Sequence, residues 1–201
     1  MVARDAVSAL ALQTGLFQMA SAVAGEAPEP KGRCRIMAAF THPDVKEYWL
    51  GWPGKAYDIA GHQKLYTETM EKAAKAQGVD LQIQQETIHD EKTLADWQQK
   101  IATAKPDGVL FVCMSLNAGW KYINKFLDER GEQPVPTVVF TPMGTSFTGH
   151  LQHSRKARNA FVGATQDVEW LATAIRMLKT VYQMANTRIC VVRGNKVHDQ
   201  K

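Results

Sequence analysis

Residues 90–114 read DEKTLADWQQKIATAKPDGVLFVCM and contain one complete helix–strand unit. Apolar residues recur at helical spacing in its first half, and this pattern stops before Pro106, which cannot continue a helix. Residues 109–114 then form an unbroken apolar run, as expected of a strand that is covered on both faces. The stretch therefore predicts a helix entered through Asp90, with a stripe of Leu94, Trp97, Ile101 and Ala104, followed by a buried parallel strand.

The same alternation continues along the chain on both sides of this unit. Short apolar runs predict six strands, at residues 35–40, 79–87, 109–114, 137–140, 160–162 and 189–192. The second run alternates apolar and polar residues, which indicates an edge strand. An edge second strand beside a central first strand fits the order 2-1-3-4-5. The predicted fold class is therefore α/β, with a three-layer, doubly wound, mostly parallel sheet of the flavodoxin-like or Rossmann-like kind.

Three further helices are predicted between these strands. One has a stripe from Tyr66 to Ala74 and ends at Gly78, because glycine readily takes the left-handed conformation that closes a helix. The next begins its stripe at Leu116 with Asn117 as a cap, and the last has a stripe from Leu171 to Tyr182. We expect Thr165 or Asp167 to cap the last helix, and we assign three tryptophans at stripe positions to the core, namely Trp97, Trp120 and Trp170.

The composition is that of an ordinary globular chain. Its 201 residues are 45% hydrophobic and 22% charged, which suits one sizeable domain. The 24 basic and 20 acidic residues are scattered, so we expect no nucleic-acid binding, and the short basic cluster at residues 155–158 is interpreted as a solvated loop. Three distant cysteines in apolar runs fit no zinc pattern and are predicted to be packed thiols: Cys34, Cys113 and Cys190.

Residues 1–30 differ from the rest of the chain. A basic start, an alanine-leucine stretch and the sequence Ala22-Val23-Ala24 are the parts of an export leader, followed by an acidic, proline-containing linker. If residues 1–24 are such a leader, the protein is exported or periplasmic; the alternative is an alanine-rich N-terminal helix of a cytoplasmic protein. No other apolar stretch approaches the length of a membrane span, so none is predicted.

The remaining residues, 31–201, are predicted to form one α/β domain. Its last apolar run, residues 189–192, is followed by polar residues and by no crossover helix that could cover it. We therefore expect this domain to be incomplete at its C-terminal end and the chain to be the N-terminal part of a longer protein.

Polar side chains follow the predicted strands, where α/β proteins place their ligand contacts. Residues 140–150 form a hydroxyl-rich, glycine-containing loop, which misses the G-x-S-x-G nucleophile motif by one residue and so does not predict a serine hydrolase. The long connection after the first strand adds aromatic residues. The predicted substrate-binding residues are Trp52, Tyr57, His62, Ser115, Asn117, Thr141, Gly144, Thr145, Ser146 and His150.

None of these residues is predicted to be catalytic or to bind a metal. Asp58 and His62 are spaced to share a helix face, but a helix cap explains Asp58 as well, and two ligands do not make a metal site. His150 and His153 lack the glutamate of a zincin. Hydroxyls, amides, imidazoles and aromatic faces suit a neutral polyol, whereas no nucleotide-binding glycine motif is present in the sequence.

Four segments together resemble a known family. Residues 51–62 (GWPGKAYDIAGH), 105–110 (KPDGVL), 141–151 (TPMGTSFTGHL) and 163–167 (GATQD) are similar to the N-terminal region of L-fucose/L-arabinose isomerase-like proteins. The resemblance implies the substrate-side domain of a ketol isomerase, which interconverts an aldose and a ketose through an enediol. It also implies a divalent metal, typically manganese, bound by residues beyond position 201, and a homo-oligomer. This chain alone is expected to be catalytically silent.

A second reading is a sugar-binding domain without catalysis, of the type I periplasmic-binding-protein kind. It accounts for the leader, the order of strands and helices, and the segment KPDGVL before the third strand. Both readings share one partner, a small-molecule sugar. They differ in what the remainder of a longer chain would supply, which is a cluster of metal-binding residues in the first case and a second similar lobe in the other.

Overall fold

The computed structural model describes residues 32–49, 56–116, 118–142, 154 and 156–188. The chain divides at Gly32 into two units, Met1–Gly32 and Arg33–Lys201, and the fold described below belongs to the second. The predictions for residues 1–30 and for a strand at residues 189–192 lie outside the described residues, as does the thiol of Cys190.

Five parallel strands form one sheet in the order β2-β1-β3-β4-β5. The strands are β1 (Arg35–Thr41), β2 (Asp80–Ile83), β3 (Gly108–Cys113), β4 (Thr137–Thr141) and β5 (Ala160–Ala164). Ile36 of β1 pairs with Leu81 on one side and with Gly108 on the other, so β1 is central and β2 is an edge strand. The predicted order and the edge position of the second strand are confirmed.

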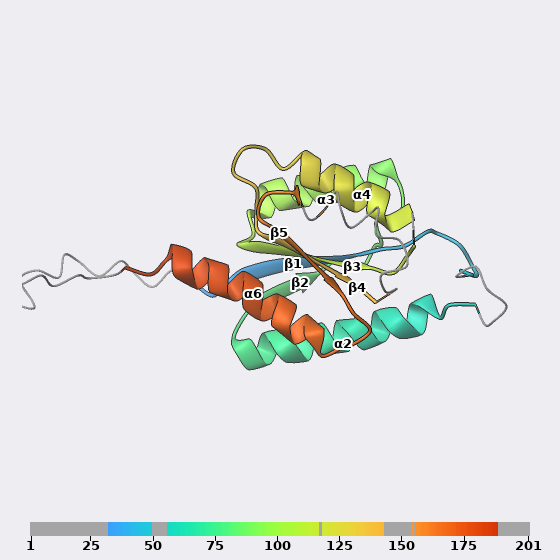
Figure 1. Cartoon of the computed structure of the whole chain (residues 1–201), viewed down its shortest axis with the longest axis horizontal. Helices are drawn as coiled ribbons and strands as arrows, with labels where there is room; N and C mark the ends of the chain where they lie inside the picture. The colour runs from blue at the N-terminus through green and yellow to red at the C-terminus, as the bar shows by residue number, and fades with distance from the viewer. Residues whose placement is uncertain (1–31, 50–55, 117, 143–153, 155, 189–201) are drawn as a thin grey trace, which may run out of the picture. The chain divides into compact units, whose positions relative to one another are not determined.

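Helices cover both faces of this sheet (Figure 1). On one face lie α2 (Ile59–Gln77) and α6 (Trp170–Ala185), and on the other lie α3 (Glu91–Ala104) and α4 (Ala118–Asp128). Alternate residues of β1 enter two separate apolar cores, with Ile36 and Phe40 facing α2 and α6, and Met37 facing α3 and α4. Burial on both faces is the reason why the central strands are unbroken apolar runs. The three-layer α/β prediction is thereby confirmed.

The ends of the first two helices follow the sequence signals. The Asp90 carboxylate accepts a hydrogen bond from the Thr93 N–H, and the Thr93 hydroxyl accepts one from the Asp90 N–H, which makes a capping box at the start of α3. Gly78 closes α2 in the left-handed conformation, with φ of 65°. The predicted start of α3 at Asp90 and the predicted ends of both helices are confirmed to within one residue.

The second strand is shorter than predicted. The Gln84 N–H donates to the Ala38 carbonyl and the Ile88 N–H donates to the Phe40 carbonyl. Between these two hydrogen bonds the chain advances four residues, from Gln84 to Ile88, whereas β1 advances only two, from Ala38 to Phe40. The two extra residues form a bulge. The prediction of a continuous strand over residues 79–87 is wrong for this reason, although Ile88 returns to pair with Thr41.

One helix start agrees with the prediction and another differs from it. α4 begins at Ala118, directly after the predicted cap Asn117, which itself lies outside the described residues. Leu116 precedes this helix, and its N–H donates to the Tyr48 hydroxyl. α6 begins after Glu169, so a cap at Thr165 or Asp167 is wrong. These two side chains instead stabilise the turn before α6: the Thr165 hydroxyl accepts a hydrogen bond from the Asp167 N–H, and the Asp167 carboxylate accepts one from the Glu169 N–H.

The tryptophan predictions hold for two of the three residues. Trp97 and Trp120 are buried among the residues that face α3 and α4. Trp170 is only partly buried; its ring stacks on Phe140 and on the exposed Phe161 of β5, the last strand of the described sheet. Within the described part of the chain, no helix combines the length and the apolar character that crossing a bilayer requires.

Candidate functional site

The connection between β1 and α2 lies against the loop that follows β3. The Tyr57 N–H donates to the Tyr48 carbonyl at 2.7 Å, which ties the two ends of the connection together. The Leu116 N–H donates to the Tyr48 hydroxyl oxygen at 2.8 Å. β1 and β3 are the strands between which the chain order of the sheet reverses, and ligands of such folds bind outside the carboxyl ends of the strands at this point.

Beneath this contact lies a tightly packed layer at the ends of β1 and β3. The Gly119 N–H donates to the Ser115 hydroxyl at 2.6 Å, in the first turn of α4. A Cβ on Gly119 would lie 2.5 Å from the Ser115 Oγ and 2.6 Å from the Thr41 Oγ1, so only glycine fits. Ser115 and Thr41 are fully buried. The predicted site residue Ser115 therefore forms part of the floor of this edge and helps to begin α4.

The thiol of Cys113 completes that floor. Its Sγ donates to the Ser115 carbonyl at 3.6 Å. Burial raises the pKa of Cys113, and the hydroxyls of Thr41 and Ser115 and the Ser115 backbone partly offset that effect. The thiol is therefore inert at neutral pH, as the prediction of a packed cysteine requires. Cys34 is likewise a free, buried cysteine.

Aromatic rings gather at the start of α2. The rings of Tyr57 and His62 are stacked, with centroids 4.4 Å apart and planes at 17°, and His62 also contacts Tyr66. The His62 Nδ1 lies 2.7 Å from the Asp58 carbonyl, which can only accept, so Nδ1 carries the proton. The Nε2 atom of His62 then remains as an acceptor. This pair brings together two residues of the predicted site.

Asp58 caps the N-terminus of α2. Its carboxylate accepts a hydrogen bond from the Gly61 N–H at 2.9 Å, which makes it the N-cap of α2, as the sequence favoured. Burial is the largest cause of the raised pKa of Tyr57, and neighbouring Tyr66 and Asp58 add to it. Burial also raises the pKa of Tyr66. The phenols are therefore neutral hydrogen-bonding groups over the physiological range.

Two further histidines lie at the carboxyl ends of β1 and β2. The His42 Nδ1 donates to the Pro43 carbonyl at 2.9 Å, and the Thr87 hydroxyl donates to the His42 Nε2 at 3.0 Å. The His89 Nδ1 donates to the Thr87 carbonyl at 3.0 Å. Sequence reasoning did not place these residues in the site. The signal was available for His42, which directly follows the first strand.

The connection also carries an exposed tryptophan beside Tyr48. Trp49 is 52% exposed, which is unusual for so large an apolar side chain. The prediction named Trp52 from the same connection. Of the predicted residues, Tyr57, His62, Ser115 and Thr141 are described, and Thr141 is buried at the end of β4. The others lie outside the described residues: Trp52, Asn117, Gly144, Thr145, Ser146 and His150.

The manganese implied by the resemblance is not matched by a ligand set in this part of the chain. The described residues contain no group of three His, Cys, Asp or Glu side chains placed to hold a metal ion. The pair of possible ligands in this part of the sequence was Asp58 with His62. The Asp58 carboxylate instead caps α2, and the His62 Nδ1 is hydrogen-bonded to the Asp58 carbonyl. What the described edge offers chemically is hydrogen bonding by neutral groups and contact with aromatic faces.

Comparisons with known proteins concern the fold alone. No protein-family model and no curated protein matches the chain. An orphan response regulator of H. pylori, HP1043, is 12% identical, with coverage of 75% of this chain and 99% of that chain and a TM-score of 0.44. The methanol:cobalamin methyltransferase complex MtaBC of Methanosarcina barkeri is 13% identical, with coverage of 82% and 55% and a TM-score of 0.46.

Proposed function

We propose that the chain binds a neutral sugar at the carboxyl edge of its sheet, as the substrate-side domain of an aldose–ketose isomerase of the L-fucose/L-arabinose isomerase-like kind. The observation that carries the proposal is the Tyr57–His62 stack at the entrance to α2, with the His62 Nε2 left as an acceptor. It lies in the connection that Tyr48 anchors to the loop after β3. The site therefore spans the strands between which ligands of this fold bind.

Aromatic faces are well suited to sugars. The C–H groups of a pyranose or furanose ring pack on apolar ring faces, while its hydroxyls need hydrogen-bond partners. For packing against the C–H groups, the described edge offers the ring of Tyr57 and the exposed indole of Trp49. For hydrogen bonding to the sugar hydroxyls, it offers the imidazole of His62 and the oxygen of the Thr87 hydroxyl, which can still accept a hydrogen bond. His62 and Thr87 are each held in place by a hydrogen bond, so little ordering of these two side chains is required on binding.

The groups at this edge favour an uncharged ligand. His42 and His62 each donate Nδ1–H to a backbone carbonyl, which fixes the orientation of both rings. The carboxylate of Asp58 is committed to the helix cap. A sugar phosphate would call for Arg or Lys side chains in this cluster, and the residues named above include none.

Isomerisation itself is not assigned to the described residues. Moving a proton between adjacent carbons of an aldose needs an acid–base pair, and polarising its oxygens calls for a Lewis acid. We assign to the aromatic and hydrogen-bonding groups at this edge the role of holding and orienting a sugar. We propose that the chain contributes substrate binding and that the chemistry belongs to other parts of the protein.

The test is a calorimetric titration of the full 201-residue chain. L-Fucose and L-arabinose should bind saturably, whereas L-fucose 1-phosphate and a uronic acid should bind much more weakly. His62→Leu should weaken sugar binding, and Lys64→Ala, an exposed change two positions further along α2, should leave it unchanged. Equal binding of neutral and charged sugars would contradict the proposal. Measurable conversion of either sugar by this chain with manganese would contradict the assignment to binding alone.

A further inference from the structure

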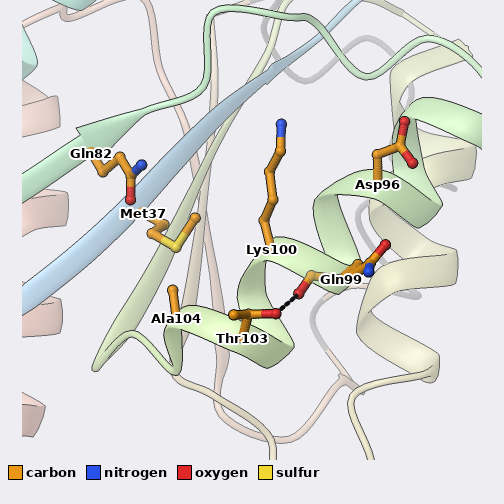
Figure 2. A pocket seen from close by; sticks show the side chains of 7 residues that line it. All are labelled: Met37, Gln82, Asp96, Gln99, Lys100, Thr103 and Ala104. Atoms are coloured by element: carbon orange, nitrogen blue, oxygen red, sulfur yellow. Dashed lines mark hydrogen bonds between the residues drawn. The ribbon is translucent and has the colours of Figure 1, made fainter.

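A polar groove runs along edge strand β2, on the face of the sheet that carries α3. Three neighbouring depressions share Met37 and Gln82, and the largest has a volume of about 500 Å3. One wall is the helix, with Asp96, Lys100 and Thr103, and Figure 2 shows these side chains beside Gln82 and Met37 of the sheet. The groove extends to the bulge after β2, where a depression of about 330 Å3 is lined by Gln84 and Glu86.

The bulge end of the groove holds a buried amide with an unused donor. Gln84 is 8% exposed, and its Oε1 accepts a hydrogen bond from the Lys100 Nζ at 3.0 Å. Its Nε2 is buried and has no hydrogen-bond partner among the described residues. The indole N–H of Trp97, which lines the same depression, also lacks one within the described part of the chain. Buried donors of this kind are rare in folded proteins and favour an acceptor in the neighbouring space.

The groove contains two oppositely charged side chains, Lys100 and Asp96, that are not paired with each other. Asp96 and Lys100 are one turn apart on α3, the spacing at which helix side chains form ion pairs. Within the described residues, neither makes an ion pair, because the Lys100 ammonium reaches Gln84 instead. Figure 2 shows the Lys100 side chain extending into the groove between Gln82 and Asp96. The groove therefore presents separated charges of opposite sign.

We propose that this groove binds a free α-amino acid. The ligand carboxylate lies between the Lys100 ammonium and the Gln84 Nε2, and the ligand ammonium lies at the Asp96 carboxylate. A zwitterion matches separated opposite charges, and charge-assisted hydrogen bonds are the strongest that such a site can make. The apolar floor of Met37 and Trp97 receives the ligand side chain.

Other small anions match the groove less well. A phosphate group carries about two negative charges at neutral pH and would face one cation at the bulge end beside the carboxylates of Glu86 and Asp96. A simple carboxylic acid would satisfy Lys100 and Gln84 and leave Asp96 unused. Lys100 is exposed and has a flexible four-carbon stem, so a carboxylate can share its ammonium with Gln84.

The test uses the full chain and four probes: L-alanine, L-glutamine, propionate and propylamine. NMR titration should give saturable shifts of the Gln84 side-chain amide and the Trp97 indole N–H with the amino acids, and weaker effects with propionate or propylamine. Lys100→Gln and Asp96→Asn should each weaken amino-acid binding by at least about tenfold. Lys72→Gln, which removes an exposed charge on α2 at the opposite face of the sheet, should have no effect.

Three results would overturn the proposal. They are the absence of shifts at millimolar amino acid, equally tight binding of propionate, and unchanged binding in either groove variant. Because Lys100 and Asp96 are not fully buried, their substitution should not unfold the chain, and an unchanged spectrum outside the groove verifies this. The sugar site lies on other residues, so either proposal can fail without the other.

Discussion

The Tyr48 hydroxyl accepts a hydrogen bond from the Leu116 N–H at 2.8 Å, between residues that are 68 positions apart in the sequence. This bond joins the connection after β1 to the loop after β3. A single phenol therefore fixes the relative position of two loops that frame the proposed sugar site.

Replacing Tyr48 by phenylalanine tests that role. The Leu116 N–H loses its partner, and we expect the free energy of unfolding to fall by about 1 kcal/mol. Sugar affinity should fall as well, because the connection that carries Tyr57 and His62 is no longer tied to the loop. Urea unfolding and calorimetric titration measure the two effects. A variant that is as stable and binds as tightly as the parent would show that this bond does not organise the site.

Gly119→Ala should destabilise the fold. In most helices this change stabilises, by up to about 1 kcal/mol. Here the new Cβ would lie within 2.6 Å of the Ser115 and Thr41 side-chain oxygens, both of which are fully buried. Overpacking of this kind costs about 1–3 kcal/mol, which outweighs the gain in helix propensity. Thermal and urea unfolding measure the difference, and a stabilised variant would contradict the close packing at the end of β1.

The stability of the chain should fall in alkaline solution. Burial raises the pKa of Tyr48, Tyr57 and Tyr66 above the value of about 10 expected in the unfolded chain. Above that pH the unfolded chain loses protons that the folded chain retains, so unfolding becomes more favourable. The free energy of unfolding should be flat with respect to these groups below about pH 10 and decline above it. Tyr57→Phe should make that decline shallower.

Urea titrations at a series of pH values measure this dependence, with the tyrosine absorbance of the folded chain as an independent check. An unchanged slope in Tyr57→Phe would show that Tyr57 ionises in the folded chain as it does in the unfolded one. Tyr182→Phe supplies the comparison, since that tyrosine lies near the end of α6, away from the connection.

Cys34 should react slowly with alkylating reagents. Its thiol is buried, and burial, with the neighbouring Asp107 carboxylate, raises its pKa to about 11, although Lys179 acts in the opposite direction. Only the thiolate is nucleophilic, so at pH 8 about one molecule in a thousand is reactive even before access is considered. Peptide mapping after iodoacetamide should find Cys34 and Cys113 unmodified in the folded chain and modified in urea. Rapid labelling of Cys34 without denaturant would contradict its packing.

Much of the fold could be predicted from the sequence. Unbroken apolar runs mark β1, β3 and β4 because both faces of these strands are covered, and the alternation in residues 79–83 marks the edge strand. Asp90 and Gly78 mark helix ends through local chemistry that needs no tertiary context. These features depend on residues that are close together in the sequence, so the sequence alone predicts them.

The features that depend on distant contacts were missed. The bulge after β2 is defined by its hydrogen bonds to Ala38 and Phe40, and the sequence of residues 84–87 does not predict it. The hydrogen bond from the Leu116 N–H to the Tyr48 hydroxyl joins two loops that are far apart in the sequence, so neither loop predicts it alone. In the site, the pairing of Tyr57 with His62 follows from their spacing at a helix start, whereas the burial of Ser115 under Gly119 follows from the packing of α4.

The most direct test of sugar binding at the carboxyl edge is backbone amide NMR of the full chain titrated with L-fucose. We predict saturable shifts confined to residues at this edge, among them His42, Tyr57, His62, Thr87 and Leu116. Amides at the opposite ends of the strands, such as those of Arg35 and Gly108, should not move. Shifts centred on those residues, or no saturable shift at any described residue, would contradict the proposed function.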